Sequence, residues 1–121
     1  MKGTVCFDFD GVIHSYTSGW QGVTVMKDPV VPGIVQAIKD IRGAGYEVIV
    51  YSTRCTTLNG ISAVRKYLRD NDIKVDGISA NKPPAIVYID DRAICFDGDA
   101  AGLLEKINTF TPWNKTERNI T

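Results

Sequence analysis

The stretch GTVCFDFDGV, residues 3–12, decides how this sequence is interpreted. Its apolar part predicts a short buried strand, and Asp8 and Asp10 lie on one side of that strand because residues i and i+2 point the same way. Two acids placed so closely repel each other unless water or a hard divalent cation offsets their charge. Gly11 permits a tight turn beside them. Taken alone, the motif fits a metal site and a water-facing strand end equally well.

Two later apolar runs also lie next to polar clusters. The run EVIVY, residues 47–51, leads into a hydroxyl pair with an arginine, and a lysine precedes the run AIVYI, residues 85–89, which ends in paired acids. In an open parallel sheet, ligands bind at the carboxyl ends of the strands. The side chains that this edge would gather are Asp8, Asp10, Ser52, Thr53, Arg54, Lys82, Asp90 and Asp91.

This order of motifs resembles the haloacid dehalogenase (HAD) superfamily of phosphotransfer enzymes. The family's four motifs are D-x-D-G-[TV], a strand ending in Ser or Thr, a Lys, and an apolar strand ending in paired acids. The resemblance spans most of the chain, from Gly3 to about Asp97. The segment STR, residues 52–54, also resembles the second motif in phosphatase domains of polynucleotide repair enzymes.

The resemblance implies an α/β fold: a three-layer, Rossmann-like, mainly parallel open sheet with helices on both faces. Residues 1–110 would form a single HAD-like phosphatase domain, and residues 111–121 a C-terminal tail. Most relatives carry a cap domain over the site. Here the interval at about 12–31 holds only a short flap, so we expect a capless member with an open site.

The implied activity is Mg²⁺-dependent hydrolysis of a phosphomonoester. Asp8 would be the nucleophile that forms an aspartyl-phosphate, and Asp10 the general acid and base. Magnesium would bind Asp8, the backbone carbonyl of Asp10, and Asp90 or Asp91. The residues expected to bind the substrate phosphate are Ser52, Thr53, Arg54 and Lys82. For Arg54, pairing with an acid as scaffolding is an equal alternative.

Local patterns place the remaining elements. Apolar stripes predict helices after Pro32, over 58–71 with Leu58 inward, and over about 100–107, with Thr56 or Thr57 capping the second. Short strands are expected at 73–78 and 93–96. Segments 12–16 and 23–26 could pair as a hairpin. Trp113 is a candidate for docking the tail on the domain.

Composition narrows the function classes. The chain has 121 residues, 44% of them hydrophobic, and zero formal net charge, which fits one small domain without an electrostatic footprint for nucleic acid. Neither a signal peptide nor a membrane span is expected.

Three cysteines without a C-x-x-C pair suit a reducing cytoplasm. Cys6 and Cys95 should be buried, and Cys55 is more plausibly structural than nucleophilic. An oligomer remains possible, and the expected partner is a phosphorylated small molecule or an accessible phosphate on a larger one.

Two alternative functions and the roles of two residues stay open. A receiver-type phosphoacceptor domain combines similar residues, but here the middle strand ends in Tyr51-Ser52 instead of an acceptor Asp. A catalytically silent metal-binding domain is the second alternative. Trp20, in the turn-rich flap, either plugs the edge of the core or contacts substrate. His14 is more typical of a satisfied or exposed loop residue than of a catalyst.

Overall fold

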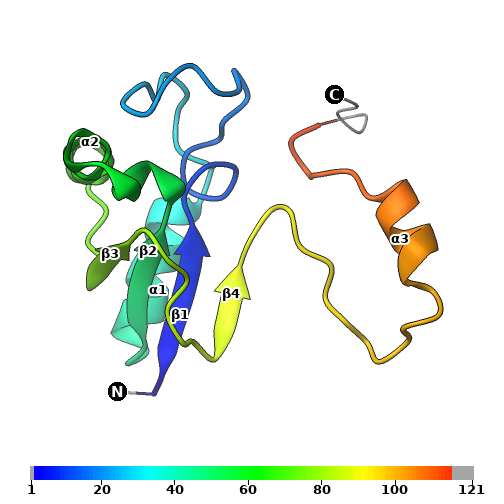
Figure 1. Cartoon of the computed structure of the whole chain (residues 1–121). Coiled ribbons are helices and arrows are strands. Elements are labelled where there is room, and N and C mark those ends of the chain that lie inside the picture. The colour runs from blue at the N-terminus through cyan, green and yellow to red at the C-terminus, as the bar shows by residue number, and fades with distance from the viewer. Residues whose placement is uncertain (1, 116–121) are drawn as a thin grey trace.

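The computed structural model describes residues 2–115 and contains one four-stranded sheet. The strands are β1 (Thr4–Asp8), β2 (Glu47–Tyr51), β3 (Gly77–Ser79) and β4 (Val87–Ile89). All neighbours are parallel, in the order β3-β2-β1-β4 (Figure 1). The expected α/β, Rossmann-like class is therefore confirmed. Because the strands are parallel, their carboxyl ends meet at one edge of the sheet.

The core lies between the sheet and two helices, α1 (Ile34–Gly43) and α2 (Leu58–Asp70). Alternation along β1 and β2 turns one set of side chains to the same face of the sheet. That set and the inward residues of both helices form one buried cluster, so α1 and α2 cover the same face. Its central members are Val5, Phe7, Val48, Val50, Ile34, Ile38, Val64 and Leu68. The helix cover expected on the other face is not found among residues 2–115, because α3 (Leu103–Thr109), the remaining α-helix there, buries none of its residues.

The start of α2 is tied to the short 3₁₀ helix η1 (Thr53–Thr56). The Thr57 hydroxyl accepts a hydrogen bond from the Gly60 amide at 3.0 Å, which confirms the expected cap. A Cβ on Gly60 would lie 1.7 Å from the Arg54 carbonyl oxygen, so only glycine allows this approach. The prediction that Leu58 points inward is wrong, since it is 82% exposed. At about 100° per residue, it lies roughly a quarter turn from the inward stripe of α2.

The flap, residues 12–31, does not form the expected hairpin. Only isolated bridges occur there, joining His14 to Asp10 and to Val30. Positive φ angles at Tyr16, Gly19 and Gly22 interrupt any regular ladder. Instead, the side chains of Arg54 and Tyr67, which lie outside the flap, donate hydrogen bonds to flap carbonyls.

After β4 the chain leaves the sheet. Residues 92–110, the C-terminal arm, lie beyond β4 and include α3 (Leu103–Thr109), which buries none of its residues (Figure 1). The strand expected at 93–96 is absent, because in the described part of the chain β4 pairs only with β1. Cys95 is consequently exposed and not buried as expected. The strand expected at 73–78 is also shorter and begins later, at Gly77. Just before it, the Asp76 side chain accepts a hydrogen bond from the Val48 amide of β2 at 2.8 Å.

The tail returns to the domain at Trp113. Its indole N–H donates to the Gly11 carbonyl at 2.6 Å, and the Asn114 side chain donates to the Ser15 carbonyl at 3.1 Å. The rest of the expected tail, from residue 116 on, lies outside the described residues. Across the described ranges, the helices are all too short or too polar to cross a bilayer.

Candidate active site

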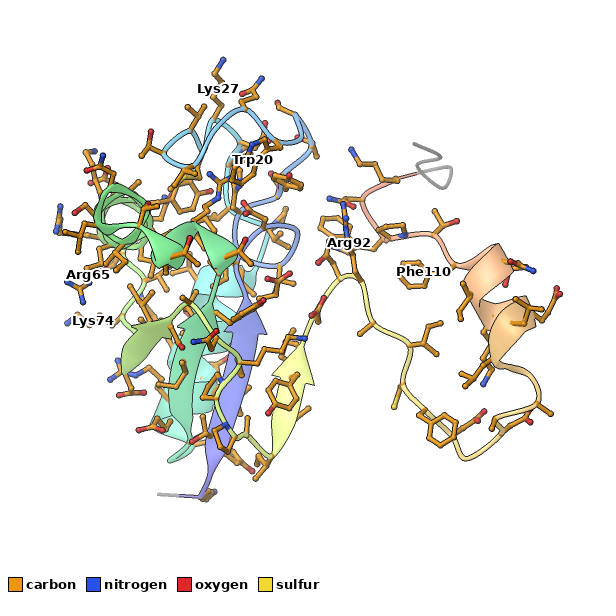
Figure 2. All side chains as sticks on the ribbon, in the orientation of Figure 1. Trp20, Lys27, Arg65, Lys74, Arg92 and Phe110 are labelled. Carbon is orange, nitrogen blue, oxygen red and sulfur yellow. The ribbon has the colours of Figure 1, made fainter. Side chains whose placement is uncertain are left out.

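The carboxyl ends of the strands surround a cavity of about 360 Å³. Phe7 is paired with Ile89 and Asp8 with Tyr51, so the ends of β1, β2 and β4 stand side by side. Side chains that the sequence singled out and that line this cavity are Asp8, Asp10, Trp20, Ser52, Thr53, Lys82, Asp90 and Asp91; Tyr16, Tyr51 and Arg92 complete the wall. Figure 2 shows Trp20 and Arg92 toward this end of the sheet.

Three acids meet at the centre of this edge. Asp8, Asp90 and Asp91 each offer a carboxylate oxygen, and these oxygens lie within 4.8 Å of one another. Burial, a hydrogen bond with Asp91 and the charge of Asp90 raise the pKa of Asp8 to about 8. Without a bound cation this favours the protonated form of Asp8 at neutral pH, chiefly because burial disfavours an ionised carboxylate and the charge of Asp90 adds to that effect.

The donor set fits a magnesium ion. Carboxylate oxygens are the ligands that this hard cation prefers, and a site with one or two direct carboxylates leaves room for water and a phosphate oxygen. A divalent charge would also remove the repulsion that raises the pKa of Asp8. The side chain of Asp10 does not join the trio, since its two oxygens bind other groups.

Gly11 makes room for the third acid. Its φ is +87°, a conformation that favours glycine, and a Cβ there would lie 2.1 Å from Asp91 Oδ2. Two structural requirements thus explain why glycine occupies this position of the D-x-D-G motif. It turns the chain after Asp10, and it admits the Asp91 carboxylate next to the backbone.

Lys82 orients Asp90 instead of reaching Asp8. Its ammonium donates to Asp90 Oδ2 at 3.0 Å, and the Arg92 amide donates to Oδ1 at 2.8 Å. Although burial opposes them, these contacts lower the pKa of Asp90, and the hydrogen bond to Asp90 raises the pKa of Lys82. Both groups therefore stay charged at neutral pH, and Lys82 places its positive charge at the rim of the cavity.

Asp10 is held by a buried arginine. Arg54 is 1% exposed, and its Nε and Nη2 donate to the two Asp10 oxygens at 2.8 and 3.2 Å. Its Nη1 donates to the flap carbonyls of Gly22 and Val23 at 2.7 and 2.9 Å. Of the two roles open to Arg54, the structure shows the scaffold, and the guanidinium does not line the cavity.

His14 is a site residue whose part the sequence analysis missed. It is buried, and its Nε2 accepts from the Asp28 amide at 3.2 Å. Since an amide can only donate, the proton is on Nδ1, which donates to Asp10 Oδ1 at 2.8 Å. Burial alone would raise the pKa of Asp10, but the bonds from His14 and Arg54 outweigh it and lower that pKa. Residues 10–14 form a turn, so no helical spacing in the sequence signalled this contact.

The two hydroxyl residues after β2, Ser52 and Thr53, make different contacts. Ser52 is buried, and its Oγ accepts from the Arg54 amide at 3.2 Å, which leaves its own proton free to be donated into the cavity. Thr53 also lines the cavity, and its carbonyl accepts from the Thr56 hydroxyl. Cys55 is buried away from this wall and free, as a structural cysteine would be.

Two larger hollows, of about 640 and 560 Å³, lie toward the opposite end of the sheet, the first next to the start of β2 and the second next to the start of β3. Both are lined by Arg42 and Asp76, which bind each other at 3.0 Å. The only group of three potential metal ligands found among residues 2–115 is the Asp8 trio. The smaller cavity at the strand ends is therefore the better candidate for chemistry.

Comparisons with known proteins bear on the fold alone. No protein-family model and no curated protein matches the chain. A solved structure described as "Structure of Pnkp1/Rnl/Hen1 complex" is similar, with a TM-score of 0.53 and 19% sequence identity. The similarity covers 86% of this chain and 34% of that one, so this chain spans about a third of the matching chain. At this level of identity the similarity is one of fold, and it agrees with the α/β architecture described above.

The cluster of Asp8, Asp90 and Asp91 leads us to predict that the folded protein binds magnesium. Adding Mg²⁺ at pH 7 should raise the melting temperature of the protein, because the ion binds the folded state alone. In the double variant Asp90→Asn/Asp91→Asn, the magnesium-induced shift should disappear, because two of the three carboxylates that would hold the ion are gone. Asp97→Asn/Asp99→Asn, in the exposed arm, is the matched control and should keep the full shift. An unchanged magnesium affinity in the first variant, measured by calorimetry, would remove both residues from the metal site.

Proposed function

We propose that this protein is a Mg²⁺-dependent phosphohydrolase that cleaves a phosphomonoester through an aspartyl-phosphate on Asp8. The observation that carries the proposal is the juxtaposition of Asp8 with Asp90 and Asp91, next to an Asp10 that is oriented by two other side chains. A cluster built only for stability would not gather three acids of which one has its pKa raised to about 8.

In the first step, an oxygen of Asp8 attacks phosphorus while the bond from phosphorus to the ester oxygen breaks. Asp8 must be ionised to attack, which requires a positive charge near the trio. Magnesium bound there would supply that charge and polarise the phosphoryl group. Ser52 donates a hydrogen bond to a phosphoryl oxygen, and Lys82 and Arg92 add positive charge at the cavity rim.

In the second step, water attacks the phosphorus of the aspartyl-phosphate and Asp10 takes its proton. The lowered pKa of Asp10 suits a base that is ionised at neutral pH. Protonating the leaving oxygen in the first step is the harder task for Asp10. The negative charge of a bound phosphate raises its pKa again and so makes this acid role accessible. Release of inorganic phosphate regenerates Asp8.

A phosphoacceptor domain without turnover is the alternative proposal. It shares the acid trio, but it has no use for a second carboxylate held by Arg54 and His14 beside the acceptor. We favour the hydrolase for this reason. The three free thiols, Cys6, Cys55 and Cys95, further suit action in a reducing cytoplasm.

The nucleophile can be tested with a generic phosphate ester such as 4-nitrophenyl phosphate. Replacing Asp8 by Asn should lower turnover by about 10³-fold or more, because no second carboxylate can form the covalent intermediate at that position. Its melting temperature should stay equal or rise, since a buried acid is removed. Asp97→Asn should leave the rate unchanged. Near-normal turnover by a folded Asp8→Asn protein would show that Asp8 is not the nucleophile.

A further inference from the structure

Three aromatic side chains border the acidic cavity. Tyr16 and Trp20 come from the flap, and Tyr51 comes from the end of β2. Ser52, Lys82 and a magnesium ion held by the central acids would account for recognition of a phosphate, but these rings serve no step of the proposed reaction. Aromatic faces beside a phosphate site are suited to the part of the substrate that leaves.

Trp20 is fixed in place yet open to solvent. Its ring lies over the Arg54 guanidinium, with 4.6 Å from Cζ to the ring centroid, and Arg54 itself is held by Asp10 and two flap carbonyls. The indole is nevertheless 54% exposed and lines the cavity. It therefore does not plug the core, and a planar group can stack on it without any rearrangement of its support.

Tyr16 adds an independent observation. Its φ of 62° lies in the left-handed region, where the backbone of any residue other than glycine is strained. Such strain persists where the surroundings impose it, and it gathers at sites that bind ligands. Here it places a ring that contacts His14 edge to face, with centroids 5.9 Å apart, at the wall of the cavity. Burial raises the pKa of its hydroxyl, so the ring stays neutral.

We propose that the flap is a leaving-group subsite that selects phosphomonoesters whose leaving group carries a planar aromatic ring, either an aryl group or a nucleobase, by stacking of that ring on Trp20 with Tyr16 beside it. The inference rests on the proposed function, because the phosphate must lie at the acids for the leaving group to reach the flap. The cavity of about 360 Å³ falls within the range for small-ligand sites. The flap supplies two of the three aromatic side chains that line this cavity.

The test compares kcat/KM of wild type and Trp20→Ala on three substrates: 4-nitrophenyl phosphate, adenosine 3′-monophosphate and glycerol 2-phosphate. Loss of one stacking contact should lower kcat/KM about tenfold for the aromatic esters. The value for glycerol 2-phosphate should change less than about twofold, since that ester presents no ring to stack. Trp20→Phe should recover part of the loss. Phe96→Ala, which removes an exposed ring from the arm, is the matched control and should leave all three values unchanged.

The outcomes separate the possible roles of Trp20. A loss confined to adenosine 3′-monophosphate assigns a nucleoside to the subsite, and a loss confined to 4-nitrophenyl phosphate assigns an aryl group. An equal loss on all three substrates would overturn the proposal, because Trp20 would then act only by supporting Arg54 and Asp10. No loss on any of them would overturn it as well.

A binding measurement separates this inference from the proposed function. Calorimetry with the Asp8→Asn protein and Mg²⁺ should show adenosine 3′-monophosphate or phenyl phosphate binding about tenfold tighter than glycerol 2-phosphate. Adding Trp20→Ala to that variant should abolish the difference. If wild type hydrolyses none of the three esters, the proposed function fails, and this difference in affinity still decides whether the aromatic subsite exists.

Discussion

The buried charge pair between Arg54 and Asp10 ties together the parts that make the site. Arg54 stands in η1 after β2, Asp10 follows β1, and the remaining guanidinium nitrogen binds the Gly22 and Val23 carbonyls of the flap. A guanidinium removed from water is stable only when its donors are matched in this way, and a single missing partner leaves a costly unpaired charge. Three chain segments are therefore fixed relative to one another by one side chain.

The consequences extend to both sides of the cavity. On the flap side, Arg54 supports the Trp20 ring, and on the acid side it lowers the pKa of Asp10 together with His14. Asp10 is thereby kept apart from the trio, where the pKa of Asp8 moves in the opposite direction. Two carboxylates two residues apart in sequence thus acquire different environments, which is the condition for giving them different chemical roles.

Much of this arrangement follows from the sequence. The apolar runs ending in polar residues predicted the parallel sheet and the edge at which Asp8, Ser52 and Asp90 meet, because strand ends and burial are local signals. The partner of Arg54 was not predictable, since a clamp and a scaffold need the same residue type. The part played by His14 was missed because its second partner, the Asp28 amide, is distant in sequence. The strand expected at 93–96 failed for the related reason that pairing depends on where the chain turns after Asp91.

A double-mutant cycle on Arg54→Met and Asp10→Asn, followed by urea unfolding, tests most directly whether this pair organises the site. Each single variant should lose stability, because Arg54→Met removes two donors from the Asp10 carboxylate and Asp10→Asn leaves the buried guanidinium without its counter-charge. The double variant should lose less than the sum of the two, with a coupling free energy of about 2 kcal/mol or more. Losses that add to within about 0.5 kcal/mol would show that the two side chains act independently, and would contradict the account.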